Sequence, residues 1–347
     1  MNKYFSQLID NLYQEVSHKK TCSLLFEKEE FDGKVYSNES FYEYTKQYFN
    51  SPQKFYLKSE NPDYIFSLKK VSDTNQFSQF SFDSPYSTRF EENKKSYFKL
   101  FNASNSDVLL IFSPGWARPN LNVEIDFCVK MMNSGINCLL PTIPFHQERT
   151  PKGFYSGELF ISANQLFTVA NFRQYVAELR NIVSYYRDKY DKIGFVGMSS
   201  GGFQAGLLTT VEEVDFYFPF ITGAELSTIT WNGTLTKYVK KDLINKNITE
   251  KELGIIWAIA DQKYLGQNCK ARYIKQYISK YDEVVPTPNQ FALNNIYNNP
   301  PTFLINSAHT SVFFSLNKII KDMTKELKAL PKIHSTNISD ANCGARH

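Results

Sequence analysis

The chain has 347 residues, of which 42% are hydrophobic and 21% charged, and its net charge is +4. This composition is typical of a globular protein with a sizeable core, and the scattered lysines form no basic face for nucleic acid. The five cysteines are widely spaced, odd in number and lack a C-x-x-C pair, which argues against a disulfide framework or a zinc site and for a reducing compartment.

The sequence shows no targeting or membrane-spanning pattern. Its first residues lack an apolar signal-peptide core, and no run of 18 apolar residues occurs anywhere. We therefore expect a cytoplasmic protein. The two N-x-T sequons, at Asn232 and Asn247, carry little weight in that setting.

Residues 1–100 are more polar than the rest, and we expect a helix and an extension that pack on the core. The helix opens the chain and carries its apolar residues at helical spacing: Tyr4, Phe5, Leu8, Ile9, Leu12 and Val16. Its favoured interpretation is packing against the domain that the rest of the chain forms. The alternative is docking on a lipid surface, with Lys19 and Lys20 near the headgroups.

From Tyr97 onward, strand-like and helix-like segments alternate. The predicted strands are residues 108–113, 136–140, 193–197, 214–220, 273–279 and 302–305. Several are continuous apolar runs, as in parallel strands that are covered on both faces. Helices are predicted along 172–186 and 311–327. We expect a mostly parallel central sheet with helices on both faces, a main domain over 101–330 and a polar tail over 331–347.

One connection is too long for a simple crossover. About 45 residues separate the strand that ends at Phe220 from the next one. They contain predicted helices over 236–244 and 249–260, the second opened by Thr249 with Glu252 three residues later, as in a capping box. We interpret 223–266 as a cap that shapes a substrate pocket, the alternative being a helical excursion remote from the chemistry.

The strongest motif is G-x-S-x-G over residues 197–201, which follows a predicted strand and precedes a predicted helix. This arrangement is typical of the nucleophile elbow of α/β-hydrolases, and the chain resembles that superfamily. Ser199 is the predicted nucleophile. With the adjacent Ser200 in that role, the bulky Met198 would occupy a position that the tight turn requires to be small.

A serine nucleophile needs a base and an orienting carboxylate, which follow in the order Ser, Asp or Glu, His in this superfamily. His309 lies in a loop of small residues between the last strand and the last helix, whereas His334 falls in the predicted tail. We therefore predict His309 as the base. Asp282, at the end of the preceding strand, is the predicted acid, and its alternatives are Glu283 and Asp261.

The oxyanion hole requires two backbone N–H groups directed at the developing charge. We predict Ser200, at the start of the helix after the nucleophile, and Trp116, in the loop after the first core strand. Pro114-Gly115 precedes Trp116 where lipases and esterases have His-Gly. No metal and no organic cofactor is implied.

The loop over 140–149, followed by Ser156-Gly157-Glu158, has a P-x-H-x-x-R pattern. It more narrowly resembles a branch of the superfamily that includes the eukaryotic α/β-hydrolase-domain-containing protein eighteen. This resemblance implies an ester or lipid hydrolase. His146 of the pattern either lines the substrate pocket or has a structural role.

The sequence therefore predicts a serine hydrolase that cleaves a carboxylic ester or thioester of a small-molecule or lipid acyl substrate. Two alternatives stay open: a catalytically silent α/β-hydrolase with a binding or regulatory role, and an acyltransferase. Contact with a membrane surface is only weakly indicated, and the sequence gives no oligomeric state.

Overall fold

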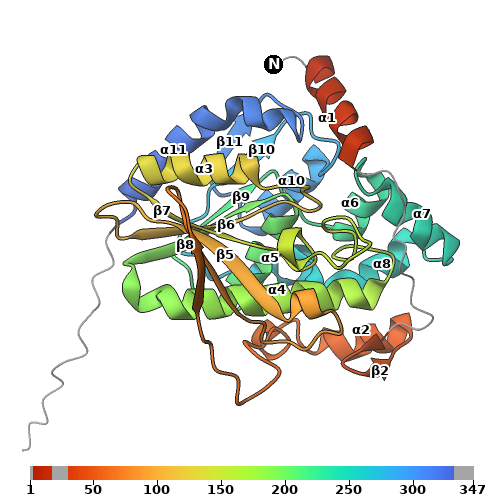
Figure 1. The fold of residues 1–347 in the computed structure, drawn as a ribbon. Coiled ribbons are helices and arrows are strands. Elements are labelled where there is room, and N and C mark those ends of the chain that lie inside the picture. The colour runs from red at the N-terminus through yellow and green to blue at the C-terminus, as the bar shows by residue number, and fades with distance from the viewer. Residues whose placement is uncertain (1–2, 18–29, 332–347) are drawn as a thin grey trace, which may run out of the picture.

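A nine-stranded sheet forms the centre of the computed structural model, which describes residues 3–17 and 30–331 (Figure 1). The strand order is β11-β10-β9-β8-β6-β7-β5-β4-β3. The strands are β3 (Lys69–Asp73), β4 (Ser78–Asp83), β5 (Lys95–Phe101), β6 (Val108–Ser113), β7 (Asn137–Pro141), β8 (Lys192–Met198), β9 (Phe216–Phe220), β10 (Gln276–Ser279) and β11 (Thr302–Ile305). Strands β6 to β11 pair in parallel, and β3, β4 and β5 add an antiparallel extension.

The six predicted strands all occur, with ends that differ by up to three residues. Strands β6 to β9 are buried along their whole length, which explains their continuous apolar sequences. The largest difference is at β10, where the prediction began at Tyr273. Residues 271 and 274 reach their neighbours only through isolated bridges, so the regular strand starts at Gln276.

Helices cover both faces of the sheet, as predicted. They are α1 (Lys3–Ser17), α2 (Asn38–Lys46), α3 (Asn122–Asn133), α4 (Gln165–Tyr186), α5 (Ser200–Thr209), α6 (Leu226–Asn232), α7 (Lys237–Asn245), α8 (Glu250–Ile256), α9 (Gln262–Leu265), α10 (Thr287–Ile296) and α11 (Leu316–Ala329). Helices α3 and α11 enclose one apolar cluster with the sheet, and α4 and α5 lie in a second cluster on the opposite face (Figure 1). The sheet is therefore the middle layer of three.

The N-terminal hundred residues do not end at a domain boundary. The predicted limit at residue 100 falls inside β5, and β3 to β5 are part of the main sheet. Before them, a small hairpin of β1 (Glu30–Phe31) and β2 (Lys34–Val35) contacts α4, while α2 packs against α8. The segment is thus partly an extension on the core and partly the edge of the sheet.

Helix α1 contacts the rest of the protein through its polar side. Ser6 and Asp10 are buried, whereas Tyr4, Phe5 and Leu8 of the predicted apolar stripe are exposed. The helix therefore packs on the rest of the protein, as expected, but over this part its apolar stripe faces outward and the contact is polar. The reason is local: the Asp10 carboxylate accepts backbone hydrogen bonds from another segment, which only the polar face can reach.

The long insertion between β9 and β10 contains α6 to α9 and lies beside the sheet (Figure 1). Its predicted capping box is present: the Thr249 hydroxyl accepts from the Glu252 N–H, and the Glu252 carboxylate accepts from the Thr249 N–H at 2.8 Å. Within residues 3–17 and 30–331, no helix combines the length and apolarity of a membrane span. The predicted tail beyond Pro331 lies outside the described residues.

Candidate active site

Ser199 occupies a strained turn between β8 and α5. Its φ of 52° and ψ of −122° lie in a region that residues other than glycine rarely adopt. A hydrogen bond of 2.9 Å from the Ser199 N–H to the Phe220 carbonyl ties the turn to β9. Neighbouring strands thus hold the serine in this conformation.

The two glycines of the motif make this turn sterically possible. A Cβ atom on Gly197 would lie 2.5 Å from the Gly202 Cα, and one on Gly201 would strike the backbone of Ser113 and Pro114. Both positions therefore require glycine because helix, strand and oxyanion loop meet there. This geometry agrees with a nucleophile elbow centred on Ser199.

Ser200 differs from its neighbour in position and environment. It is the first residue of α5, and its buried hydroxyl has no hydrogen-bond partner in the part of the chain that the structure describes. Of the two serines, only Ser199 has the strained backbone conformation. The geometry thus supports Ser199 as the nucleophile, while the Ser200 N–H at the helix start keeps its predicted role in the oxyanion hole.

Asp282 and His309, the predicted acid and base, are hydrogen-bonded to each other. The Asp282 Oδ2 lies 2.8 Å from the His309 Nδ1. The same carboxylate is fully buried as a side chain and accepts three further hydrogen bonds of 2.9 Å, from the Val284 and Val285 N–H groups and from the Gln290 amide. This set of donors holds the carboxylate in place as a hydrogen-bond acceptor for the imidazole.

The environment of His309 has opposing effects on its pKa. Burial lowers the pKa, but the charge and hydrogen bond of Asp282, together with the charge of Asp10, outweigh burial, so the pKa lies above the usual 6.5. Arg118 acts in the opposite direction to the two carboxylates. The imidazolium is therefore stabilised, as a base that accepts a proton during catalysis requires.

The two rival acids have other partners. Asp261 is buried and accepts from the backbone N–H groups of Glu225, Leu226 and Lys263, so it holds the start of α6. Glu283 accepts from the Gln7 amide of α1. Neither contacts the imidazole, which makes Asp282 the carboxylate that orients His309.

One contact of a complete triad is not formed. Within residues 3–17 and 30–331, no hydrogen bond joins the Ser199 hydroxyl to His309. Ser199, Asp282 and His309 nevertheless follow β8, β10 and β11, whose carboxyl ends meet at one edge of the sheet. In enzymes without bound substrate, catalytic hydrogen bonds are often long and tighten in the complex.

The predicted oxyanion loop lies over the nucleophile. A Cβ atom on Gly115 would be 3.6 Å from the Ser199 Cβ, and Trp116 lines the same cavity as Ser199. The Trp116 indole N–H donates to the Gly157 carbonyl at 2.7 Å. The next residue, Ala117, has a φ of 56° and donates its N–H to His146. Because the Ala117 N–H is engaged, Trp116 stays the predicted second donor.

His146 has a structural partner on each ring nitrogen. Its Nε2 accepts from the Ala117 N–H at 2.9 Å, and its Nδ1 lies 2.8 Å from the Pro144 carbonyl. This pattern defines the tautomer with the proton on Nδ1. His146 is 1% exposed and does not line the cavity beside Ser199. Of its two interpretations, the structural one fits: His146 supports the oxyanion loop.

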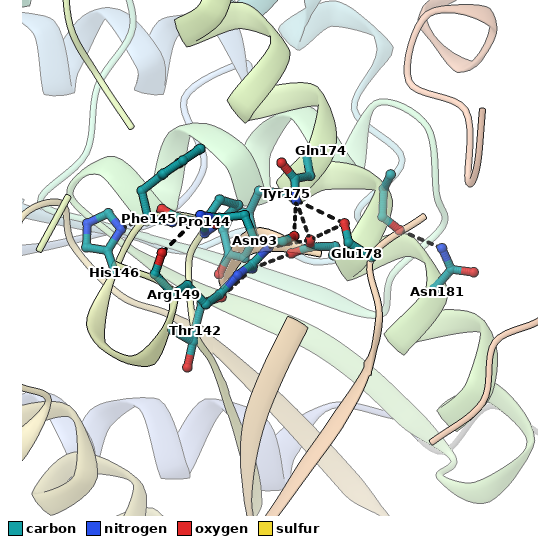
Figure 2. A network of polar contacts seen from close by, with 12 residues as sticks. Asn93, Thr142, Pro144, Phe145, His146, Arg149, Gln174, Tyr175, Glu178 and Asn181 are labelled. Atoms are coloured by element: carbon teal, nitrogen blue, oxygen red, sulfur yellow. Dashed lines mark hydrogen bonds and ion pairs between the residues drawn. The ribbon is translucent and has the colours of Figure 1, made fainter. Parts of the chain in front are cut away.

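Arg149 and Glu178 form a buried ion pair that sequence reasoning missed, shown in Figure 2. The two guanidinium nitrogens donate to the two carboxylate oxygens at 2.7 and 2.8 Å. Arg149 also donates to the Thr142 carbonyl at 3.0 Å. The Asn93 side chain joins the network by donating to the Arg149 carbonyl and accepting from the Phe145 N–H. Arg149 of the P-x-H-x-x-R pattern thus anchors the loop over 140–149 to α4. The arginine of the pattern was the sequence feature from which this ion pair could have been predicted.

A small cavity opens beside Ser199. Its volume is about 40 Å³, and its walls come from both the catalytic domain and the insertion: Trp116, Ile161, Phe172, Ser199, Ser200, Phe203, Leu226, Ile229, Thr230, Leu235, Thr236, Trp257, Val284 and Val285. Leu235 and Trp257 of the insertion line the cavity, whereas Ile256 of the same insertion does not and belongs to the buried core. The insertion therefore forms one wall of the cavity.

The strand order, the elbow after β8 and the positions of Asp282 after β10 and His309 after β11 are those of the α/β-hydrolase fold, and the chain adopts this fold. Within it, residues 122–273 match the sequence family described as "Alpha/beta hydrolase domain containing 18". This is the branch that the loop over 140–149 resembles. No curated protein matches the chain in sequence.

Solved structures of low sequence identity share the fold. Acetyl xylan esterase 1 from Thermoanaerobacterium sp. JW/SL YS485 is 15% identical with a TM-score of 0.56, and the match covers 85% of this chain and 99% of the esterase. Acetyl xylan esterase from Paenibacillus sp. R4 is 15% identical with a TM-score of 0.55, covering 91% and 98%. The acylaminoacyl peptidase of Pyrococcus horikoshii is 12% identical with a TM-score of 0.55, and the match covers 78% of this chain but 46% of the peptidase.

Proposed function

We propose that the protein is a serine hydrolase that cleaves a carboxylic ester or thioester through an acyl-enzyme. The observation that carries the proposal is the 2.8 Å pairing of Asp282 with His309, at the sheet edge where Ser199 occupies its strained turn. A binding protein needs neither the buried carboxylate–imidazole pair nor the strain at the serine.

In the proposed mechanism, the Ser199 hydroxyl attacks the acyl carbon while His309 Nε2 takes its proton. Asp282 holds the proton on Nδ1 and stabilises the imidazolium that forms. The N–H groups of Trp116 and Ser200 stabilise the oxyanion. His309 then protonates the leaving group. In the second half of the reaction, His309 takes a proton from a water molecule that attacks the acyl carbon, and it returns the proton to the Ser199 oxygen as the acid leaves.

The cavity suggests the size of the acyl group. One water molecule needs about 10–15 Å³, so 40 Å³ holds only a short acyl chain in this conformation. A longer chain, including that of a lipid, would extend beyond this cavity. We therefore propose short-chain acyl esters as the substrates to test first, in keeping with acetyl esterases among the structures that share the fold.

One observation favours a second candidate, a catalytically silent α/β-hydrolase with a binding role. The hydrogen bond from Ser199 to His309 is not formed among the described residues. An acyltransferase, in which an alcohol replaces water, would use the same site and would differ only in the acceptor.

Labelling by a fluorophosphonate probe, combined with turnover of acyl esters of graded length, tests the proposal. We expect wild type and Ser200→Ala to label, and Ser199→Ala to lose labelling and turnover, with a rate loss on the order of 10⁶-fold. A wild-type protein that neither labels nor hydrolyses any ester would support the silent candidate. Turnover that rises when an alcohol is added would indicate acyl transfer.

A further inference from the structure

Asp10 of α1 binds the backbone of the loop that carries His309. Its Oδ2 accepts from the His309 N–H at 2.7 Å, and its Oδ1 accepts from the Thr310 N–H at 2.7 Å and from the Ser311 N–H at 3.4 Å. Asp10 is 3% exposed. A side chain from the first helix therefore holds three successive N–H groups about 300 residues further along the chain.

These N–H groups need an acceptor from outside their own segment. They lie at the start of the 3₁₀ turn Ser311–Ser315, and the first N–H groups of a helical turn have no partner within it. A carboxylate accepts at both oxygens at once, and charge strengthens each bond. An amide in its place offers one acceptor oxygen and turns a donor toward the remaining N–H groups.

Helix α1 also contacts the loop that carries the acid. The Gln7 side-chain amide donates to the Glu283 carboxylate, next to Asp282. The two loops are joined directly as well, by a 2.9 Å hydrogen bond from the Tyr281 N–H to the Ser307 carbonyl. The polar side of α1 thus lies against both loops, but only the Asp10 contact is made with a member of the predicted acid–base pair, because Gln7 contacts Glu283 and not Asp282.

We propose that Asp10 is a positioning residue for His309: its carboxylate fixes the backbone over 309–311 and so holds the imidazole against Asp282, with the second ring nitrogen available to Ser199. The proposal rests on the proposed function, in which His309 is the base. It assigns to the N-terminal helix a role in catalysis that its amphipathic sequence does not indicate.

The charge of Asp10 adds a second effect that can be measured. Asp10 and Asp282 both raise the pKa of His309, and Arg118 lowers it. Burial raises the pKa of Asp10 itself, and the charge of His309 and the backbone N–H groups of residues 309 and 310 act against that rise. Removal of the Asp10 charge withdraws stabilisation from the imidazolium, so the pKa of His309 should fall.

The test compares Asp10→Asn and Asp10→Glu with Gln7→Ala, which removes the other polar contact of the same helix one turn earlier. Measured quantities are kcat and KM for a short acyl ester, the rate of fluorophosphonate labelling, thermal unfolding, and the pKa of His309 by ¹³C NMR of labelled histidine, assigned with His309→Gln.

For Asp10→Asn we expect kcat and the labelling rate to fall about 10- to 100-fold with a smaller change in KM, because misplacement of a catalytic group by about 1 Å costs that much. Its His309 pKa should be lower than that of wild type. Asp10→Glu keeps the charge but moves the carboxylate by one methylene, so the pKa should stay near wild type while the rate falls. Gln7→Ala should stay within about twofold of wild type in rate.

The inference is overturned if Asp10→Asn retains the wild-type rate and the wild-type His309 pKa, whatever its thermal stability. If Asp10→Asn does not fold, the test is the rate of Asp10→Glu. Turnover by Asp10→Glu at the wild-type rate would then overturn the inference. The NMR titration needs no turnover. If wild type proves inactive, so that the proposed function fails, an unchanged His309 pKa in Asp10→Asn still overturns the role of Asp10, and a lowered one supports it.

Discussion

Gly157 lies directly against the ring of His146. A Cβ atom at position 157 would be 2.5 Å from the His146 Nε2 and 2.8 Å from the Ala117 Cα, and Gly157 has a φ of 87°. His146 in turn accepts the hydrogen bond of the Ala117 N–H. A single glycine thus allows the histidine to support the backbone of the predicted oxyanion loop.

Gly157→Ala should therefore reduce both activity and stability. The added methyl displaces His146 from Ala117 and disturbs Trp116, whose indole donates to the Gly157 carbonyl. Loss of one oxyanion donor costs about 10²- to 10³-fold in kcat, so we expect a fall in kcat of that order. The matched control is Gly153→Ala, which has a φ of 94° but open space at its Cβ. Both variants place a side chain at a positive φ and are strained to a similar extent. Equal losses in ester turnover would therefore contradict a role for the contact between Gly157 and His146.

The pH dependence of turnover should show the titration of His309. Its pKa lies above 6.5, because the Asp282 and Asp10 carboxylates outweigh burial. The base must be neutral to accept the serine proton, so kcat/KM should fall as pH drops through this pKa, with a midpoint above about 6.5. Initial rates with a short acyl ester between pH 4 and pH 9 measure this. A rate that stays level down to pH 4 would exclude a histidine base.

The Arg149→Met variant should have a much lower free energy of unfolding than wild type. The substitution leaves the buried Glu178 carboxylate without its cation, which costs about 3–5 kcal/mol. Lys130→Met is the control: it breaks the exposed Lys130–Asp126 pair of α3, which contributes at most about 1 kcal/mol. Urea denaturation gives both free energies of unfolding. Similar values for the two variants would show that the loop over 140–149 does not depend on this ion pair.

Strands β6 to β9 were predictable from sequence because they are buried on both faces and therefore have continuous apolar sequences. Strand β6 was predicted with the observed ends, and Ser199, Asp282 and His309, chosen from the motif order, follow β8, β10 and β11 in the structure. Strands β3, β4 and β5 were not predicted, and for β3 the reason is the opposite one. β3 lies at the edge of the sheet and all its residues are exposed, so its sequence is polar and carries no apolar alternation.

The supporting contacts of the site were not predictable in the same way. Asp10 and His309 are about 300 residues apart, and the pairing depends on a helix that turns its polar side inward. His146 has no defined role until Ala117 and Gly157 come beside it in the fold. Such contacts depend on relative placement in three dimensions, which a local sequence pattern does not contain.

Leu235→Ala should change the preferred acyl length. Leu235 comes from the insertion and lines the cavity with Ser199, whereas Ile244, on α7 of the same insertion, is 52% exposed and does not line it. Removing the Leu235 side chain lengthens a cavity of about 40 Å³, and each methylene that the substrate can then bury contributes about 0.8 kcal/mol, or nearly fourfold in kcat/KM.

The expected result is a higher ratio of kcat/KM for longer over shorter acyl esters in Leu235→Ala, and an unchanged ratio in Ile244→Ala. Labelling of Ser199 by a small fluorophosphonate should stay close to wild type in both, because the acid–base pair is held by the sheet and not by the insertion. Proportional loss on every ester together with loss of labelling would mean that the segment over 223–266 serves folding. Since Leu235 is partly buried against the core, thermal unfolding of both variants separates that outcome from a change in specificity.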